Sequence, residues 1–464
     1  MKGQVIYIEN IPFENFTKIK VFQSANQHME AEFSGVISKE FATDYEKLGV
    51  YSEKVSVWIC DEDNKKHIWF NGIIEEFYIS VCGDVYTLLL KITSYSKKSD
   101  IKKYMRSFQG AELTYEDVIG LLCKNSEKDG YKLDVLMQNV DKKKKIHDFL
   151  VQYEETDWEF LKRLASRCHG FLFPCTSISQ NGIYFGMHPY LAKGELNTAE
   201  YIVRKDIKEY YYNQSDTKLK YDEADSVSYI VESDNIYSLC DCIVLNGIDL
   251  YIFAIESNLV GARLVHRYTL KKAYGFRTRT TYNEKLAGVA LMGRVHKIQR
   301  DAIQVKLDSD IEQKDYRWFS YATIYSSADD TGWYFMPEEG DRIRLVFPSR
   351  YEKDSYVVSS VHMGDRMEAE IKSIRTRHKK EVVFSPESIY ISNGAGSHIE
   401  LNDKAGIILY SEKQIIIESE DNIDISGKGE VCIIGNSGVA VQQKENRIDI
   451  DDTIDIVAGR LRLR

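Results

Sequence analysis

An eight-residue repeat at the end of the chain limits what this sequence can fold into. Apolar residues two positions apart recur every eight residues between 389 and 464, with polar residues and glycines between them. Because residues i and i+2 lie on one face of a strand, each octad is predicted to form one short strand with one apolar face, followed by a turn. The clear pairs are Ile399 with Leu401, Ile407 with Leu409, Ile415 with Ile417, Ile423 with Ile425, Val431 with Ile433, and Val439 with Val441.

Such a repeat needs neighbours that cover its apolar face and pair its strand edges. A single-chain β-solenoid with roughly three octads per coil would hold only about two coils, fewer than a stable stack needs. Three copies of the chain, wound into a triangular prism, would bring the apolar pairs together on one axis and leave no free lateral edge. We favour this trimeric β-prism, with the solenoid as the alternative. The spacing changes in the last three pairs, which predicts an altered final section: Ile448 with Ile450, Ile454 with Ile456, and Leu461 with Leu463.

The composition favours a mainly β, multidomain fold without nucleic-acid specificity. The 464 residues suffice for three or four domains, and 31 tyrosines against 6 prolines suit a β-rich chain. A net charge of −10 argues against generic nucleic-acid binding, which depends on a basic surface. Residues 1–16 contain no signal-peptide pattern, and no apolar run is long enough for a transmembrane helix, so we expect synthesis in the cytoplasm.

The residue types that carry chemistry form no recognisable constellation. The eight cysteines include no matched CxxC pairs and the ten histidines are dispersed, so we predict no metal and no cofactor. Glu154, Glu155, Asp157 and Glu159 offer the residue type of a glycosidase pair, but a solvated helix start explains them better. We therefore predict no catalytic residue.

Changes in pattern along the chain predict five parts. Residues 1–105 alternate through several strands and are expected to form a β-barrel or sandwich-like domain. Residues 106–285 are expected to form a second domain, with inserted α/β elements, a helix at 157–168 and further strands. Residues 286–365 contain five predicted strands, the size of an OB-fold. Residues 366–388 form a charged link, and 389–464 form the octad-repeat prism.

The predicted helix at 157–168 carries clear start and stop signals. Thr156 and Glu159 have the spacing of a capping box, and Asp157 places negative charge in the first turn. Gly170 is the expected stop.

These stretches together resemble a known family. The segment from Gln152 to Gly170 looks like the hub motif of VgrG proteins and phage late-control tail proteins, the segment from Gly332 to Asp341 resembles their OB-domain motif, and the octads resemble the trimeric needle of contractile-tail spikes. The motif positions are Tyr153, Thr156, Asp157, Phe160, Leu161, Leu164 and Gly170 in the first segment, and Gly332, Trp333, Pro337, Gly340 and Asp341 in the second.

The resemblance implies a homotrimeric hub-spike of a contractile injection machine. Its hub would form β-barrel domains that adapt the tail tube and baseplate to a needle that pierces the target envelope. The chain would leave the cell as part of an assembled particle. The resemblance implies no enzymatic activity, although a tail-associated cell-wall hydrolase and a receptor-binding adhesin are the alternatives.

The apex departs from some relatives of this family. Some spikes bind iron through an apical His-x-His motif, whereas here no histidine follows His398. We therefore predict no apical iron, and we expect a separate tip protein of the PAAR type to cap the needle. An apical ion held by Asp449, Asp451 and Asp455 is the alternative.

Overall fold

The computed structural model of a single chain describes residues 5–44, 54–60, 66–146, 149–175, 182–187, 193–196, 198–311, 315–329, 331–360, 364, 368–450 and 453–462. They belong to two compact units, Met1–His362 and Met363–Arg464. Strands dominate both units, so the predicted mainly β, multidomain class is confirmed. None of the helices within the described ranges has the length and apolar character needed to cross a membrane.

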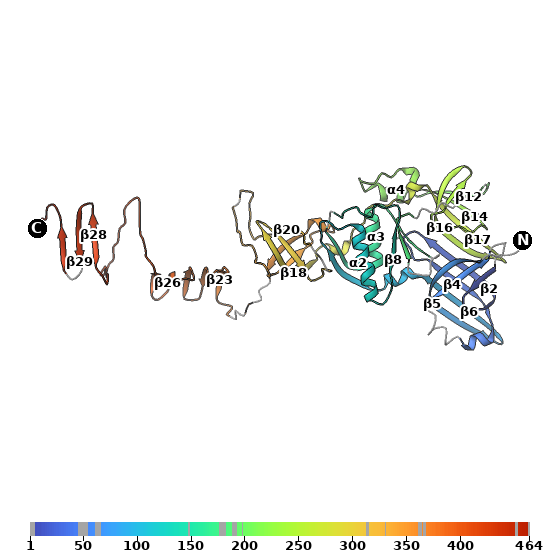
Figure 1. The fold of residues 1–464 in the computed structure, drawn as a ribbon, viewed down its shortest axis with the longest axis horizontal. Helices are drawn as coiled ribbons and strands as arrows, with labels where there is room; N and C mark the ends of the chain where they lie inside the picture. Colours follow the sequence, from blue (N-terminus) through green and yellow to red (C-terminus); the bar gives the residue numbers. More distant parts are fainter. Residues whose placement is uncertain are drawn as a thin grey trace. The chain divides into compact units, whose positions relative to one another are not determined.

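One large sheet dominates the first unit. Its strands are β1 (Val5–Ile8), β2 (Phe13–Ser24), β3 (Glu30–Ile37), β4 (Val55–Cys60), β5 (Lys66–Cys82), β6 (Val85–Ser94), β12 (Lys193–Leu196), β13 (Ile202–Lys205), β14 (Val227–Ser233), β15 (Cys242–Leu245), β16 (Ile248–Val260) and β17 (Arg263–Lys271). Their order is β1-β4-β5-β6-β3-β2-β16-β17-β14-β13, and β15 joins β16 to β12. Figure 1 shows the blue strands of the first hundred residues beside the yellow-green strands of β14, β16 and β17.

This sheet corrects the expected division at residue 105. Strand β2 pairs with β16 from Ser24↔Ala254 to Lys20↔Asn258, so residues 1–105 and 106–285 share one sheet. No barrel closes among the described strands, since the path runs from β1 to β13. The physical reason is that β2 would otherwise present an unpaired edge, which is costly to leave open. The sequence pattern shows that each half has strands, but it does not show that the halves pair.

A mixed α/β insert lies between the two halves of the sheet in sequence. It contains η1 (Tyr95–Asp100), β7 (Lys103–Phe108), α2 (Tyr115–Lys128), β8 (Asp134–Met137), β9 (Leu150–Thr156), α3 (Asp157–Arg167), β10 (Leu172–Pro174) and β11 (Gly182–Phe185). Strands β7 and β9 form a hairpin-like pair, and β10, β11 and β8 form a small sheet. Helices α2 and α3 pack into a core of their own around Leu122, Phe160 and Leu164.

The predicted start of α3 is confirmed. Thr156 Oγ1 accepts a hydrogen bond from Glu159 N–H (3.1 Å), and Glu159 Oε2 accepts one from Thr156 N–H (2.9 Å), which completes the capping box. At the other end, His169 adopts a left-handed conformation (φ 55°) and Gly170 N–H donates to Ala165 O (2.9 Å). The helix therefore stops where expected, but His169 rather than Gly170 takes the left-handed position.

Short helices connect the remaining parts of this unit. They are α4 (Ile207–Gln214), η2 (Glu223–Ser226), η3 (Ala273–Phe276), η4 (Glu284–Leu286) and η5 (Glu352–Asp354).

The predicted OB-fold appears as a five-stranded sheet. Its strands are β18 (Ala290–Gln299), β19 (Ala302–Leu307), β20 (Trp318–Ser320), β21 (Arg342–Val346) and β22 (Tyr356–Ser360), in the order β20-β19-β18-β21-β22. An isolated parallel bridge, Tyr321↔Val357, links the two end strands. Five strands curled until their ends meet at one bridge make the partly open barrel expected of an OB-fold.

The second unit consists of consecutive antiparallel hairpins, which Figure 1 draws in orange and red. The first sheet holds β23 (Lys372–Arg375), β24 (Glu381–Phe384), β25 (Ser388–Ser392), β26 (Ser397–Asn402) and β27 (Gly406–Ser411), and the second holds β28 (Val439–Gln443), β29 (Asn446–Ile450) and β30 (Ile454–Val457). The segment 366–388, expected as a link, thus contributes β23 and β24. Its basic residues form the turn between these two strands, of which β24 has the apolar spacing of the octads, in Val382 and Phe384, and β23 contributes Ile374 opposite Val382.

Asp241 gives a test of the packing in the large sheet. It is buried (5% exposed), and burial raises the pKa of its carboxyl from 3.8 to about 6, although Oδ2 accepts a hydrogen bond from Ser238 N–H (2.7 Å). Because the folded-state pKa lies above the unfolded value, ionisation of the carboxyl destabilises the folded protein. This destabilisation grows as the pH rises from about 4 to 6 and stays constant above pH 6.

We expect Asp241→Asn to raise the free energy of unfolding at pH 7.5 by up to about 3 kcal/mol and to change it little at pH 4. Urea denaturation of both proteins at the two pH values measures this difference. The exposed Asp249→Asn is the matched control and should change stability little at either pH. A gain from Asp241→Asn that is equal at both pH values would contradict the buried, proton-retaining carboxyl.

Candidate functional site: a buried junction at α3 and an uncovered strand repeat

Helix α3 is tied to the strands beside it through the buried carboxylate of Asp157. The Asp157 side chain is fully buried. Its Oδ1 accepts hydrogen bonds from Arg106 Nη1 (2.7 Å) and Gln152 Nε2 (3.0 Å), and its Oδ2 accepts one from the Tyr131 hydroxyl (2.7 Å). Burial and then the Asp157 charge raise the pKa of Tyr131, which keeps that hydroxyl a donor. Asp157 therefore fastens α3 to β7, β9 and the loop after α2.

The first turn of α3 is also fastened to the segment that leaves the large sheet. Thr156 Oγ1 donates to Asp100 Oδ1 in η1 (2.6 Å), and Trp158 is buried against the ring of His28 (4.4 Å between centroids). Burial acts to raise the pKa of Asp100, but hydrogen bonds from His28 and Thr156 outweigh it and hold the pKa below its ordinary value.

The far side of α3 is joined to the OB-fold by a buried charge cluster. Arg163 donates from Nε and Nη2 to the two carboxylate oxygens of Glu155 (2.8 and 2.7 Å), and from Nη1 to Glu352 Oε1 in η5 (2.7 Å). Arg163 and Glu352 are 3% and 2% exposed. Burial alone would lower the pKa of Arg163, but the two carboxylates raise it above its ordinary value. Arg167 Nη2 completes the cluster by donating to Glu352 Oε2 (2.9 Å).

A second polar contact and a shared core hold the OB-fold to β7 and β9. Gln109 Nε2 donates to both carboxylate oxygens of Asp310 (2.9 Å each), and the Ser107 hydroxyl donates to Asp310 Oδ1 (2.5 Å). Phe149 and Val151, at the start of β9, are fully buried among the side chains of the OB-fold strands. The OB-fold is therefore continuous with the α3 region.

The structure shows what the first motif does. Thr156, Asp157, Phe160, Leu161 and Leu164 are all buried, and each holds α3 against a neighbour or fills its core. Tyr153 packs against the OB-fold core. The sequence analysis missed Arg106 and Glu352, which bind Asp157 and Arg163 of this segment, and it missed Asp310, which binds Ser107 and Gln109 outside the segment. No local signal could have found them, because they lie far from the motif along the chain.

The second motif shapes a turn of the OB-fold. Gly332 has φ 144°, and a Cβ there would lie 2.4 Å from Tyr325 O, so a side chain does not fit. Gly340 also has positive φ (92°), and its N–H donates to Val295 O (2.9 Å). Asp341 Oδ2 accepts from Glu338 N–H (2.8 Å), which closes the turn that begins at Pro337. Trp333, by contrast, is 48% exposed.

The octad pairs align across the strands of the second unit. Ile399 lies opposite Leu409, and Leu401 opposite Ile407. The alignment continues to Ile391 and Ile389 on β25. Opposite residues of antiparallel strands share a face, so two apolar ladders run along one face of this sheet. The last hairpins repeat the pattern, with the ladders Val441–Ile448–Ile456 and Val439–Ile450–Ile454.

These ladders are uncovered in the single chain. Eleven of the twelve predicted axial residues are at least 41% exposed, and Val439 is half-buried. One chain alone therefore does not bury these side chains. Their place in a core stays a prediction for an assembly of several chains.

The middle three octads depart from regular strand structure in the single chain. Ile417, Ile425 and Ile433 are predicted to lie in the core of a trimer, and in one chain they are 67%, 71% and 69% exposed. Their octad partners Ile415, Ile423 and Val431 are 48%, 49% and 51% exposed. All six lie within residues 412–438, which are all described and hold no strand.

The physical reason for this departure is the lack of a partner within one chain. A strand requires a hydrogen-bonded neighbour, and an apolar side chain is buried only where another surface covers it. Among its described residues, the single chain thus forms strands only at the two ends of the repeat, and one strand with a buried face for every octad stays a prediction for an assembled prism.

The final section, where the apolar spacing changes, holds β29 and β30. Asp449 and Asp455 lie opposite each other on β29 and β30, and Arg447 Nε donates to Asp449 Oδ1 (2.6 Å). Asp451 and Leu463 lie outside the described residues. Within the described ranges, no group of three or more histidine, cysteine, aspartate or glutamate side chains is arranged to hold a metal ion.

One cluster superficially resembles a hydrolase triad. His28 Nδ1 lies 2.8 Å from Ser96 Oγ, and its Nε2 lies 3.1 Å from Asp100 Oδ2. Ser96 is only 1% exposed and also bonds Ser94 Oγ (2.8 Å). A nucleophile needs contact with a substrate carbonyl, so this buried serine serves the packing of η1 rather than acyl transfer.

Comparisons with known proteins agree on the fold. No family model matches the sequence, and no curated protein matches it. Among solved structures, the chain matches the E. coli c3393 protein with TM-score 0.53 at 12% identity, over 77% of this chain and all of that one. The c3393 protein is a component of the type VI secretion system and is described as structurally similar to the T4 tail proteins gp27 and gp5. The Francisella PdpA–VgrG complex matches with TM-score 0.58 in its lidded form, at 10% identity, over 89% of this chain and 81% of that one. This chain therefore has the fold shared by these proteins.

The charge cluster at α3 predicts a large cost for removing its arginine. Arg163→Met would leave Glu155 and Glu352 buried without their main partner, which is expected to lower the free energy of unfolding by about 3–5 kcal/mol. Lys128→Met removes the same charge from an exposed position at the end of α2 and should change stability by less than about 0.5 kcal/mol. Urea denaturation measures both, and an equal effect of the two substitutions would show that the buried cluster does not hold the junction.

Proposed function

We propose that this chain is the hub-spike of a contractile injection machine. Three copies would assemble, with the first unit forming the hub and the second forming a needle that pierces the target envelope. The proposal rests on the fold that the chain shares with a type VI secretion component and a PdpA–VgrG complex, and on one observation in its own structure. That observation is the pair of apolar ladders that the single chain leaves uncovered.

The energetics of these ladders favour association with further copies. An exposed isoleucine or leucine gains roughly 1.5–3 kcal/mol when it is fully buried. Soluble monomers rarely expose a continuous apolar face of this length. Identical copies offer an identical ladder at the same height, so a three-fold axis would bury all the pairs at once and would supply strand partners to residues 412–438.

The OB-fold presents a second apolar surface suited to the same assembly. Ile324, Tyr325, Trp333, Tyr334 and Phe335 are 48–90% exposed. They belong to one loop whose two arms pair at the Ser326↔Gly332 bridge, and the Tyr334 hydroxyl donates to Arg300 O (2.9 Å). Aromatic residues of this kind are enriched at protein interfaces. In the proposed trimer this surface would pack against a neighbouring copy.

The proposal includes partners at both ends. The hub would bind tail-tube and baseplate proteins, and a PAAR-type tip protein would cap the needle near its C-terminal strands. The chain would act without a cofactor and without catalysis, as a mechanical part of a particle assembled in the cytoplasm and exported. The cell-wall hydrolase reading receives no support from the buried Ser96 cluster.

The oligomeric state is the first test of this proposal. Light scattering of the full chain is expected to give three times the 53.6 kDa chain mass, whereas a chain ending at residue 370 is expected to be monomeric at micromolar concentration. The shorter chain retains the whole first compact unit, so it should still fold. A monomer in both cases would exclude the intertwined needle.

Two neighbouring isoleucines on β27 distinguish a trimer axis from a free sheet. Ile407 belongs to a ladder and is 78% exposed, whereas Ile408 faces the other side and is 37% exposed. In an isolated chain, Ile408→Asp should be the more harmful change, because Ile408 is the better buried. On a three-fold axis the order reverses, since Ile407→Asp places three carboxylates together away from water.

We therefore expect Ile407→Asp to abolish the trimer and Ile408→Asp to leave it assembled. Light scattering at matched concentration reads out both variants. A trimer that survives Ile407→Asp would refute the axial position of the ladders.

A further inference from the structure

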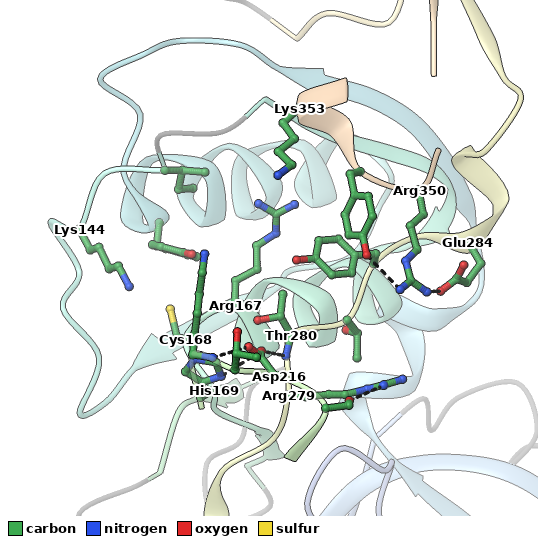
Figure 2. Close-up of a pocket in the computed structure, with 18 of the residues that line it drawn as sticks. Lys144, Arg167, Cys168, His169, Asp216, Arg279, Thr280, Glu284, Arg350 and Lys353 are labelled. Carbon is green, nitrogen blue, oxygen red and sulfur yellow. Dashed lines mark hydrogen bonds and ion pairs between the residues drawn. The ribbon is translucent and has the colours of Figure 1, made fainter. Parts of the chain in front are cut away.

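A basic cavity lies beside the C-terminal end of α3. It has a volume of about 1080 Å³, and its lining comes from the loop at 144–146, the end of α3, the segment 212–218, the segment 279–284 and the region of η5. The lining contains seven lysines and arginines but only two carboxylates, Asp216 and Glu284. Figure 2 shows side chains from these separate segments around the space. The cavity is a local excess of positive charge in a chain of net charge −10.

Much of this charge is not neutralised by the protein. Arg350 Nη1 pairs with Glu284 Oε1 (2.6 Å), Lys145 Nζ with Glu112 Oε2 (2.5 Å), and Arg167 Nη2 with Glu352 Oε2 (2.9 Å). Lys144, Lys218 and Lys353 form no ion pair with any residue that the structure describes. Asp216 already accepts hydrogen bonds from the backbone N–H groups of Thr280 (2.9 Å) and Lys218 (3.0 Å). The Asp216 carboxylate is therefore already hydrogen-bonded to the backbone that lines the cavity.

Contacts with neighbouring residues hold two of the lining arginines, Arg167 and Arg279, in place. Arg167 is only 9% exposed in its side chain, and in Figure 2 it and Lys353 point toward each other across the space. The guanidinium of Arg279 stacks on the ring of Tyr212 (3.9 Å), and its Nη1 donates to Ser215 Oγ (2.9 Å). Like charges directed into one partly enclosed space repel each other, and an anion between them removes that cost.

We propose that this cavity binds a small anion carrying several phosphate groups. Each phosphate offers three acceptor oxygens and up to two charges, which suits lysines, arginine forks and the hydroxyls of Thr217 and Thr281 in the lining. The volume exceeds what one phosphate fills. The overall negative charge of the chain disfavours a long nucleic acid, because that polymer would extend over the acidic surface, whereas a compact oligophosphate stays within the basic lining.

Binding would have a structural consequence that does not depend on the proposed function. The ligand would contact Arg167 at the end of α3 and Lys353 in η5, so it would bridge the two elements that also share the Glu352 carboxylate. A ligand that binds only the folded state raises the unfolding temperature. The cavity would therefore couple anion concentration to the strength of the junction between α3 and the OB-fold.

Sodium tripolyphosphate titrated into the full-length protein tests the proposal. Isothermal calorimetry is expected to show one saturable site per chain, and the unfolding temperature should rise with ligand concentration. Lys144→Gln and Lys353→Gln should each weaken binding by about tenfold. Lys143→Gln is the matched control, since it removes the same charge from the same run of lysines at a position that does not line the cavity, and it should weaken binding less than twofold.

Each other outcome would overturn the proposal. Absence of saturable binding would do so, and so would an equal loss in Lys143→Gln and Lys144→Gln, which would show only diffuse attraction. Binding of a glutamate-rich peptide or a single-stranded oligonucleotide, with the same dependence on Lys144 and Lys353 but without tripolyphosphate binding, would identify a macromolecular ligand instead. All three lysines are exposed, so circular dichroism should show unchanged folding in every variant.

Discussion

The ion pairs of Arg163 are the constraint on which the first unit depends. One guanidinium holds Glu155 from its own region and Glu352 from the OB-fold, 189 residues away in sequence. Buried ion pairs are weak contributors to net stability, since their desolvation offsets most of the attraction. An apolar contact would hold α3 and the OB-fold together as well. It would tolerate sliding, however, whereas the Arg163 guanidinium with its four acceptor oxygens, two on Glu155, one on Glu352 and the carbonyl of Val151, admits one arrangement. We read the cluster as a device that fixes the orientation of the OB-fold relative to α3.

The sequence predicted those features that are set locally. The capping box at Thr156 and Glu159, the length of α3 and the five strands of the OB-fold all follow from residues close together in the chain. The pairing of β2 with β16 could not be predicted, because the two strands lie more than 200 residues apart and the sequence of neither strand identifies its partner. The same limit hid Glu352 and Asp310. The link at 366–388 was misjudged for a different reason: its many charged residues obscured two short strands, β23 with Ile374 as its one apolar residue and β24 with Val382 and Phe384.

The two units differ in how much apolar surface each buries within a single chain. The first buries large cores, with Phe33, Phe160 and Phe347 wholly inside it. The second has ladders in register but no partner for their apolar face, and its segment 412–438 has no strand neighbour among the described residues. By the usual accounting of apolar burial, a chain of this kind gains little from folding the second unit alone. Its order in an assembled particle would then come from association.

Coupled folding and association has a mechanical consequence for the proposed needle. If each strand pairs with strands of other copies, no chain can detach without breaking ladders with both neighbours, and the barrier to unfolding grows with every octad added. The needle would then be stable for kinetic reasons even where its equilibrium stability is modest. The first unit has the converse arrangement, in which each copy carries its own core and charge cluster. In the proposed trimer, three first units would fold first and would hold the three repeats close together, which would raise the effective concentration of the repeats and favour the prism over the pairing of strands from unrelated particles.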